Sequence, residues 1–162
     1  MLHAKQGGLR MDIYESLNSI LVTLFNDILN IEEKALITEE FKDISVTDMH
    51  IIEAIGIRQP KTMTAISKSL GVTMGTLTVG INGLVKKGYV VRERGEKDRR
   101  VVYASLTLKG HHAFQHHMQF HKDMIDSITK NLTEEEASIL IKTFVKLEDF
   151  FGQWITHNKE DN

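Results

Sequence analysis

Apolar residues recur at three- and four-residue steps near both ends of the chain, which is the spacing of one face of an amphipathic helix. The first run spans residues 11–35 and has an apolar stripe formed by Ile13, Leu17, Ile20, Leu24, Ile28 and Ile31. The second run follows Thr133 and has a near-heptad stripe formed by Ala137, Leu140, Phe144, Leu147, Phe151 and Trp154. Two terminal stripes this apolar predict an isologous dimer built from the first and last helices.

Shorter helical patterns fill the middle of the chain. Ser45 and Asp48 form a capping-box pattern in front of a helix that ends near Gly56. The next helix has an apolar stripe formed by Met63, Ile66 and Leu70. Gly71 then stands where a left-handed C-cap residue is expected, and Thr73 is placed to cap a further helix. That helix has an apolar stripe formed by Leu77, Ile81 and Leu84, so the pair is typical of a helix-turn-helix.

Two runs rich in valine and tyrosine follow, at residues 89–94 and 101–106, and predict strands around a charged turn. The turn presents three cations at its tip, as a β-hairpin wing does, and arginine in a narrow minor groove reads DNA shape. An acid beside phosphate is unfavourable unless it orients a cation, so we expect Asp98 to brace Arg100.

The second helix of the helix-turn-helix has small, hydroxyl, amide and methyl groups on the face opposite its apolar stripe. This face suits the DNA major groove, because Asn can pair with adenine, Thr with a base or phosphate, and Val with a thymine methyl. The predicted DNA contacts of helix and wing are Thr73, Thr76, Thr78, Val79, Asn82, Lys86, Lys97, Asp98, Arg99 and Arg100. Gly75, Gly80 and Gly83 each cost about 1 kcal/mol inside this helix, which predicts close approach to DNA or a malleable helix.

Charge is unevenly distributed. Residues 86–109 hold eight Lys/Arg against three Asp/Glu, in a chain whose net charge is −2. Residues 12–53 hold ten acids against two lysines, which keeps that part away from DNA. A basic island in an acidic chain is the electrostatic footprint of a phosphate-binding surface. An ordinary solvated surface or a purely structural helical adaptor would leave this island unexplained.

Composition is that of a globular protein, with 162 residues, 41% of them hydrophobic and 26% charged. The absence of cysteine excludes disulfides and thiol-based redox sensing. No apolar run reaches the roughly 18 residues of a membrane span, and no signal-peptide core is present, so we expect a cytoplasmic protein. Since there is no nucleophile elbow, phosphate-binding glycine loop or H-E-x-x-H pattern, we reject an enzyme.

The predicted fold is mostly α with a small β-hairpin wing, dimerised through the N- and C-terminal helices. Residues 1–11 lack periodicity and are expected to be a disordered extension, with Met11 as a natural start. Residues 12–162 are expected to form one domain, with dimerisation helices in 12–44 and 107–162 and a winged helix-turn-helix in 45–106.

The wing sequence Asp98-Arg99-Arg100 and the following V-V-Y-A-S-L-T-L-K-G resemble the MarR family of bacterial transcription regulators, with its Asp-x-Arg and Leu-Thr-x-x-Gly marks. The resemblance covers nearly the whole chain. The most similar branch represses fatty-acid synthesis genes in lactic and related Gram-positive bacteria. The matching stretches are F-K-D-I-S (41–45), M-H (49–50), residues 71–82, K-K-G-Y (86–89) and D-R-R-V-V (98–102). This resemblance implies a homodimeric repressor that binds a DNA palindrome and uses acyl-acyl carrier protein as corepressor.

An acyl chain would need a largely apolar pocket, and methionine and phenylalanine adapt well to a flexible chain. The predicted lining is Leu24, Ile28, Phe41, Met49, Ile52, Phe114, Met118 and Phe120, although the same residues would also suit a plain core. An acidic carrier protein would need cations outside the DNA footprint, for which the candidates are Arg58, Lys61 and Lys122.

The helix predicted from Thr107 holds five histidines, His111, His112, His116, His117 and His121. Pairs four residues apart, 112 with 116 and 117 with 121, can place two imidazoles on one metal ion. A zinc-sensing branch of the resembled family uses histidines of this helix together with an equivalent of His50. The alternative function is therefore a zinc-responsive repressor with His50, His112 and His116 as ligands and Glu32 or Glu33 completing the site. Otherwise these histidines form a polar helix face, and no resident cofactor is expected.

Overall fold

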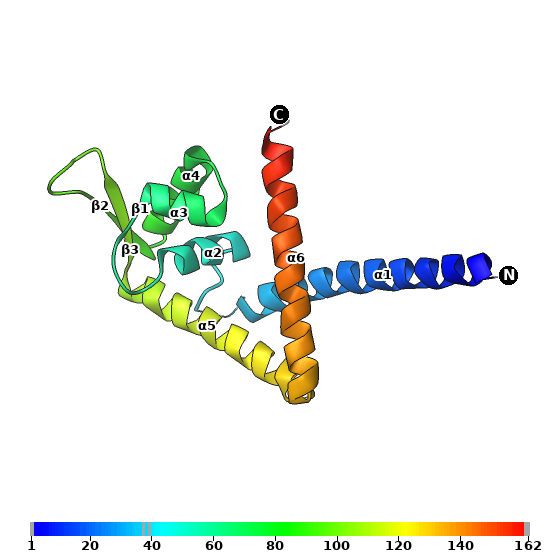
Figure 1. The fold of residues 1–162 in the computed structure, drawn as a ribbon. Coiled ribbons are helices and arrows are strands. Elements are labelled where there is room, and N and C mark those ends of the chain that lie inside the picture. The colour runs from blue at the N-terminus through cyan, green and yellow to red at the C-terminus, as the bar shows by residue number, and fades with distance from the viewer. Residues whose placement is uncertain (1, 37, 39, 161–162) are drawn as a thin grey trace. The chain divides into compact units, whose positions relative to one another are not determined.

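The computed structural model describes the backbone of residues 2–36, 38 and 40–160, and the side chains of residues 12–36, 38 and 40–154. Figure 1 shows the order of the elements, which are α1 (Leu2–Leu36), α2 (Val46–Ile55), β1 (Lys61–Thr62), α3 (Met63–Leu70), α4 (Met74–Lys86), β2 (Val90–Arg94), β3 (Val102–Leu106), α5 (Leu108–Thr129) and α6 (Glu134–Glu160). This order of elements, mostly helices with one small sheet, confirms the predicted fold class, a mostly helical winged helix-turn-helix.

The chain divides into two compact units, Met1–Phe120 and His121–Asn162. In the first unit, helices α2, α3 and α4 and the sheet surround an apolar core. Its deepest side chains are Met49, Ile52, Ile55, Ile66, Leu77, Ile81, Leu84, Tyr89 and Val90. The predicted buried stripe of α4 is confirmed, and its burial turns the opposite face of that helix outward.

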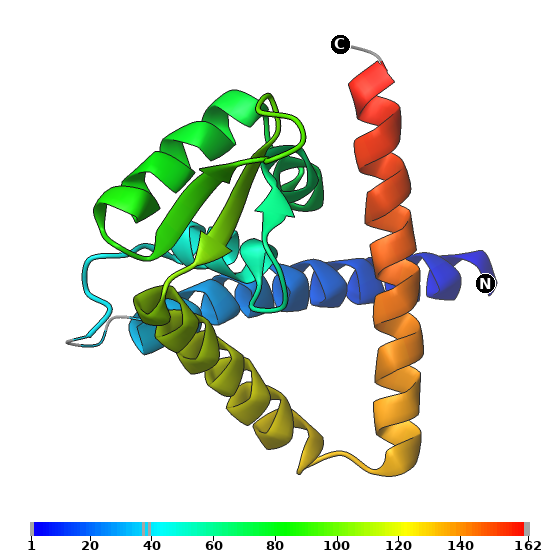
Figure 2. The ribbon, with the colours of Figure 1, turned by 90° about the vertical axis from the view of Figure 1, so that its left-hand side faces the viewer.

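The sheet has three antiparallel strands in the order β1-β3-β2, whereas the sequence predicts the β2–β3 hairpin alone. Figure 2 shows the strands side by side, with α4 next to them. Strand β1 pairs Lys61 with Ala104 and Thr62 with Tyr103. A strand of two residues is too short to show an alternating pattern, which explains why the sequence did not reveal it.

Local capping fixes where the helices of the first unit begin and end. The Ser45 hydroxyl accepts from the Asp48 amide at 3.1 Å, and the Asp48 carboxylate accepts from the Ser45 amide at 3.2 Å, so the predicted capping box is confirmed. Gly71 ends α3 in the left-handed conformation, with φ of 66°. The Thr73 hydroxyl accepts from the Thr76 amide at 3.1 Å and begins α4. The helix-turn-helix is therefore built as its capping residues predict.

Helix α1 begins at Leu2 rather than at Met11, so the expected disordered extension is wrong for residues 2–11, while Met1 lies outside the described residues. Residues 2–10 contain no proline that would interrupt the helix. Once a helix has formed, each further residue gains one backbone hydrogen bond, so α1 can extend toward the N-terminus without an apolar stripe. Several apolar side chains of α1 are exposed, among them Ile13, Leu17, Ile20, Phe25, Leu29 and Ile31.

In the second unit, α6 begins with the predicted capping box. The Thr133 amide donates to the Glu136 carboxylate at 2.8 Å, and the Glu136 amide donates to the Thr133 hydroxyl at 3.3 Å. Helix α6 also exposes apolar side chains, including Ile139, Ile141, Phe144, Val145, Phe150 and Trp154. In the part of the chain that the structure describes, no helix is both long enough and apolar enough to cross a membrane.

Candidate DNA interface

The outer face of α4 is polar and accessible. Val79 is 74% exposed, while Leu77 and Ile81 on the opposite face are buried. The hydroxyl groups of Thr73 and Thr76 lie 2.9 Å apart at the start of the helix. The Thr78 hydroxyl donates to the carbonyl oxygen of Met74 at 2.7 Å, so it keeps its acceptor capacity and its methyl group for a partner. These groups match what a major-groove reading helix presents.

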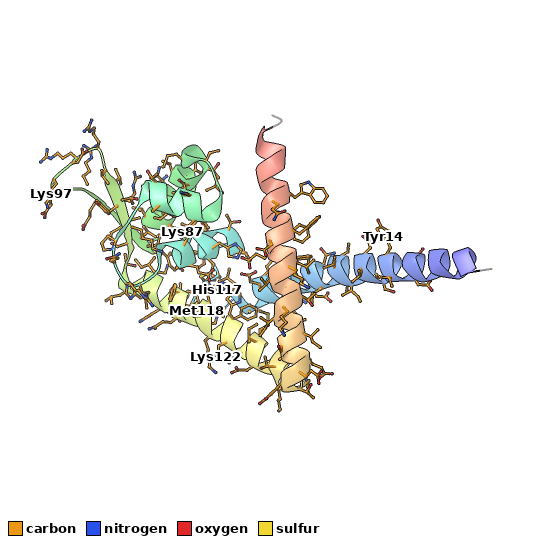
Figure 3. The ribbon with its side chains drawn as sticks, viewed as in Figure 1. Tyr14, Lys87, Lys97, His117, Met118 and Lys122 are labelled. Carbon is orange, nitrogen blue, oxygen red and sulfur yellow. The ribbon has the colours of Figure 1, made fainter. Side chains whose placement is uncertain are left out.

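The wing extends beyond the body of the first unit, and Lys97 lies at its tip (Figure 3). The Asp98 carboxylate accepts from the Arg100 backbone amide at 2.9 Å and from the Arg100 guanidinium at 3.2 and 3.3 Å. The side-chain bond from Arg100 holds the pKa of Asp98 below its ordinary value. The predicted bracing of Arg100 by Asp98 is therefore confirmed. A Cβ on Gly95 would lie 2.8 Å from the carbonyl oxygen of Asp98, so this tight turn needs glycine.

Asn82 has a partner that the sequence did not predict. The Arg92 guanidinium of β2 donates to the Asn82 side-chain oxygen at 2.7 Å, and both residues are exposed. Arg92 is absent from the predicted DNA contacts because its strand position alone does not reveal that it faces α4. The amide that the sequence assigns to adenine therefore has its oxygen already hydrogen-bonded.

A cavity of about 550 Å³ opens between α4, the start of α3 and the base of the wing. Its lining combines hydroxyl, guanidinium and apolar groups from Thr62, Met63, Thr64, Met74, Thr78, Arg92, Arg100, Val101 and Val102. The predicted DNA contacts Thr78 and Arg100 both border this cavity. The three elements therefore form one concave, cationic surface.

One glycine of α4 has a role other than the predicted one. A Cβ on Gly80 would lie 2.5 Å from Cδ1 of Ile51 in α2, so Gly80 allows α2 and α4 to pack closely. No atom lies within 4 Å of a Cβ built on Gly83, and the nearest to one on Gly75 is the Thr73 hydroxyl at 3.8 Å. Close approach to DNA or malleability stays a prediction for these two glycines alone.

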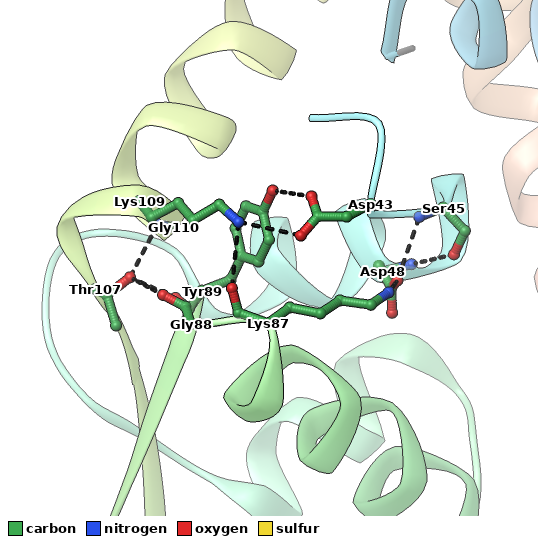
Figure 4. A network of polar contacts seen from close by, with 9 residues as sticks. All are labelled: Asp43, Ser45, Asp48, Lys87, Gly88, Tyr89, Thr107, Lys109 and Gly110. Carbon is green, nitrogen blue, oxygen red and sulfur yellow. Dashed lines mark hydrogen bonds and ion pairs between the residues drawn. The ribbon is translucent and has the colours of Figure 1, made fainter. Parts of the chain in front are cut away.

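A polar network lies behind the reading helix and joins it to the wing base and to the segment before α2 (Figure 4). The Tyr89 hydroxyl donates to one Asp43 carboxylate oxygen at 2.6 Å, and the Lys109 ammonium donates to the other at 3.1 Å. The Lys109 ammonium also lies 4.0 Å from the centre of the Tyr89 ring. At the end of α4, Lys87 donates to the Asp48 carboxylate at 2.7 Å.

The ionisation of this network follows from its contacts. Burial and the hydrogen bond to Asp43 raise the pKa of Tyr89 well above its ordinary value, which keeps the hydroxyl a donor. Burial raises the pKa of Asp43, but the hydrogen bonds from Tyr89 and Lys109 outweigh it, so the net shift is downward. Asp43 therefore stays a carboxylate and anchors both donors.

The predicted effector-pocket residues differ in their burial. Phe41, Met49 and Ile52 belong to the buried core, and Phe114 packs against it. Leu24 and Met118 are exposed, and Ile28 and Phe120 are partly buried. The ring of Phe120 stacks on that of His117 at 6.2 Å. The plain-core reading therefore accounts for four of the eight residues in this conformation.

Two of the histidines proposed as metal ligands contact other groups of the first unit. The His112 ring is 3.8 Å from the Glu40 carboxylate, and the His116 ring is 3.0 Å from the carbonyl oxygen of Ala35. In the described residues, no group of candidate metal ligands combines them with His50, and the trio of His50, His112 and His116 stays a prediction.

His50 instead meets a buried acid that a different histidine also approaches. Its ring nitrogen lies 3.0 Å from the Glu32 carboxylate, and that of His117 lies 3.5 Å from the same oxygen. His117 and Glu32 are each only 4% exposed. On α5, His117 continues the buried stripe of Gly110 and Ala113, and this helical phase turns it toward the acid.

Comparison with known proteins is consistent with this geometry. A family model described as "MarR family" matches residues 42–101. The chain is 30% identical to the multiple antibiotic resistance protein MarR of Escherichia coli, over 72% of this chain and 90% of that one. It is 32% identical to the regulator YkoM of Bacillus subtilis over 59% of this chain and 62% of that one. The crystal structure of Streptococcus pneumoniae FabT in complex with DNA superimposes with a TM-score of 0.83 and 41% identity, over 87% of this chain and 99% of that one.

Proposed function

The chain belongs to the MarR family of DNA-binding transcriptional regulators, and on this basis we propose that it is a homodimeric repressor of fatty-acid synthesis genes. The observation that carries the proposal is the concave surface formed by α4 and the braced wing, in a chain 41% identical to a protein whose structure holds DNA. In this proposal α4 enters the major groove, and Lys97, Arg99 and Arg100 reach the minor groove or the backbone.

Dimerisation is supported by the two terminal helices, each considered alone. Helices α1 and α6 both expose apolar stripes in the single chain. Such stripes are costly in water, and a second copy of the same chain can cover them through one two-fold axis. A two-fold protein would bind a palindrome with half-sites about one helical turn apart.

The proposed corepressor is a long-chain acyl-acyl carrier protein, supported by the resemblance to the fatty-acid branch of the family at residues 41–45 and 86–89. Phe41, Met49 and Ile52 are packed, so the acyl chain would enter by displacing or separating core side chains. Of the proposed docking cations, Lys61 donates to the carbonyl oxygen of Ala54 at 2.7 Å and Lys122 pairs with Asp126 at 2.6 Å. Arg58 is exposed and is the docking candidate we would test first.

The test is a band-shift titration on a palindrome from a fatty-acid synthesis promoter, run alone, with long-chain acyl-acyl carrier protein and with zinc. A carrier protein without its acyl chain and a scrambled palindrome serve as controls. Tightening by the acylated form alone is the expected result. Equal effects of the acylated and unacylated carrier would refute the corepressor proposal, and equal binding to the scrambled DNA would refute the operator.

A zinc-responsive repressor is the second candidate, and the contacts around Glu32 favour it. Imidazole nitrogen and carboxylate oxygen are ligands that zinc accepts, and His50 and His117 both approach the Glu32 carboxylate. Metal analysis of the purified protein and a zinc titration test this function directly. His117→Ala should abolish zinc binding, whereas His112→Ala, five residues earlier on the same helix, should leave it intact. Zinc binding that persists in His117→Ala would refute this site.

A further inference from the structure

Strand register explains why Arg92 reaches the reading helix. Directly opposite residues of an antiparallel pair project to the same face, and Arg92 pairs with Ala104, which is buried. Val90, two residues before Arg92 on the same face, is buried as well. Arg92 therefore leaves β2 on the face of the sheet that packs against the helices. Its guanidinium extends past the core and meets Asn82 at 2.7 Å.

This contact fixes the orientation of the Asn82 amide. A guanidinium has only N–H donors, so it can approach the amide oxygen and not the amide nitrogen. The Asn82 NH₂ group must then point away from Arg92. A hydrogen bond from a charged donor is also roughly twice as strong as one between neutral groups. The bond from Arg92 can therefore compete with a hydrogen bond from a DNA base to the same Asn82 oxygen.

The oriented pair differs chemically from a lone asparagine. Bidentate reading of adenine needs the amide oxygen to accept from N6 while the amide nitrogen donates to N7. In this protein one lone pair of the oxygen is already engaged by Arg92, and the groups that Asn82 turns away from Arg92 are the two N–H donors of its amide nitrogen. The major-groove edge of guanine offers two acceptors, N7 and O6, whereas adenine would turn its own N6 donor toward these donors.

We propose that Arg92 and Asn82 act as one specificity unit that selects guanine in each half-site, with Arg92 as the residue that positions the Asn82 amide. This inference rests on DNA binding by α4 and adds the base preference to it. The cavity that Arg92 borders together with Thr78 leaves room for a base edge beside the pair.

Selection of binding sites from a random double-stranded DNA pool tests the proposal whatever the operator sequence is. The selected palindrome is then titrated with every single-base change in one half-site, for the wild type and for Arg92→Ala, Asn82→Ala and the double variant. The wild type should prefer guanine over adenine at one position by about 5- to 150-fold, the range of one good base contact. Arg92→Ala should lose most of this preference or shift it toward adenine, because the Asn82 oxygen is released.

A matched control comes from the same strand. Arg94 lies two residues further on the same face of β2, and Arg94→Ala removes the same charge without the contact to Asn82. It should weaken binding to all sequences alike and leave the base profile unchanged. Asn82→Ala and the double variant should share one profile, because Arg92 acts through Asn82.

The outcomes separate this inference from the fatty-acid role. A wild-type palindrome in which adenine is preferred at the position sensitive to Asn82, or an Arg92→Ala profile equal to that of Arg94→Ala, would overturn the specificity unit. A palindrome with the expected guanine dependence but no match in fatty-acid promoters would support the unit and refute the proposed gene targets.

Discussion

Alanine at Gly80 and alanine at Gly83 make the same chemical change in the same helix but meet different surroundings. A Cβ on Gly80 would overlap Cδ1 of Ile51 at 2.5 Å, whereas one on Gly83 meets nothing within 4 Å. Ile51 is 6% exposed and packs within the core, so its side chain has little free space to move into. The two variants therefore isolate the fit between α2 and α4.

The expected free energies follow from two terms. Replacing glycine by alanine inside a helix stabilises the folded state by about 1 kcal/mol. Overpacking a core site by one methyl group costs about 1–3 kcal/mol. Gly83→Ala should therefore stabilise by about 1 kcal/mol, and Gly80→Ala should range from neutral to destabilising by about 2 kcal/mol. The difference between the two variants, about 1–3 kcal/mol, reports the overlap with Ile51 alone.

Urea unfolding followed by circular dichroism measures both variants, at one fixed protein concentration because a dimer's stability depends on concentration. Ile51→Val removes the overlapping methyl group, so in this background Gly80→Ala should increase the free energy of unfolding. Equal stabilisation by Gly80→Ala and Gly83→Ala would refute the packing role of Gly80. A coupling energy near zero between Gly80→Ala and Ile51→Val would refute it independently.

Three further changes test other parts of the structure. Arg100→Ala should weaken palindrome binding and reduce the salt slope by about one unit for each half-site, and an unchanged affinity would contradict the wing assignment. Gly110→Ala should destabilise strongly, because its Cβ would overlap the carbonyl oxygen of Tyr89, and a wild-type unfolding midpoint would contradict that contact. Asp43→Asn should reduce stability at neutral pH. Because the folded pKa of Asp43 lies below its ordinary value of 3.8, the stability it gives is present above that value and is lost as pH falls, so the variant and wild type should converge in acid.

Regular local patterns predicted most of the fold. The spacing of Leu77 and Ile81 and the caps at Ser45 and Thr73 depend on neighbours a few residues away, and the structure confirms them. Strand β1 depends on pairing with a partner some forty residues later, which no local pattern reports.

The site was less predictable, because its contacts depend on how separate elements are turned relative to one another. Asp98 and Arg100 are two residues apart, and their contact was predicted correctly. Arg92 reaches Asn82 only because the register of β2 turns it toward α4. His117 reaches Glu32 because of its phase on α5, and the i,i+4 spacing of histidines does not choose between phases. The buried stripe formed by Gly110 and Ala113 was the signal that could have identified it.

The structure also changes the number of cations in the basic island, residues 86–109, that are available to contact phosphate. Lys87 pairs with Asp48 and Lys109 with Asp43 behind the reading helix, so two of its eight cations neutralise acids of the protein itself. If all eight contacted phosphate, a dimer would lose affinity with a salt slope of about −14, and with six it would be about −11. A measured slope steeper than about −11 would mean that the Lys87 and Lys109 pairs break on DNA. A slope of about −11 or shallower would mean that the two pairs stay closed, and that Asp48 at the start of α2 holds the end of the reading helix through Lys87 in the complex.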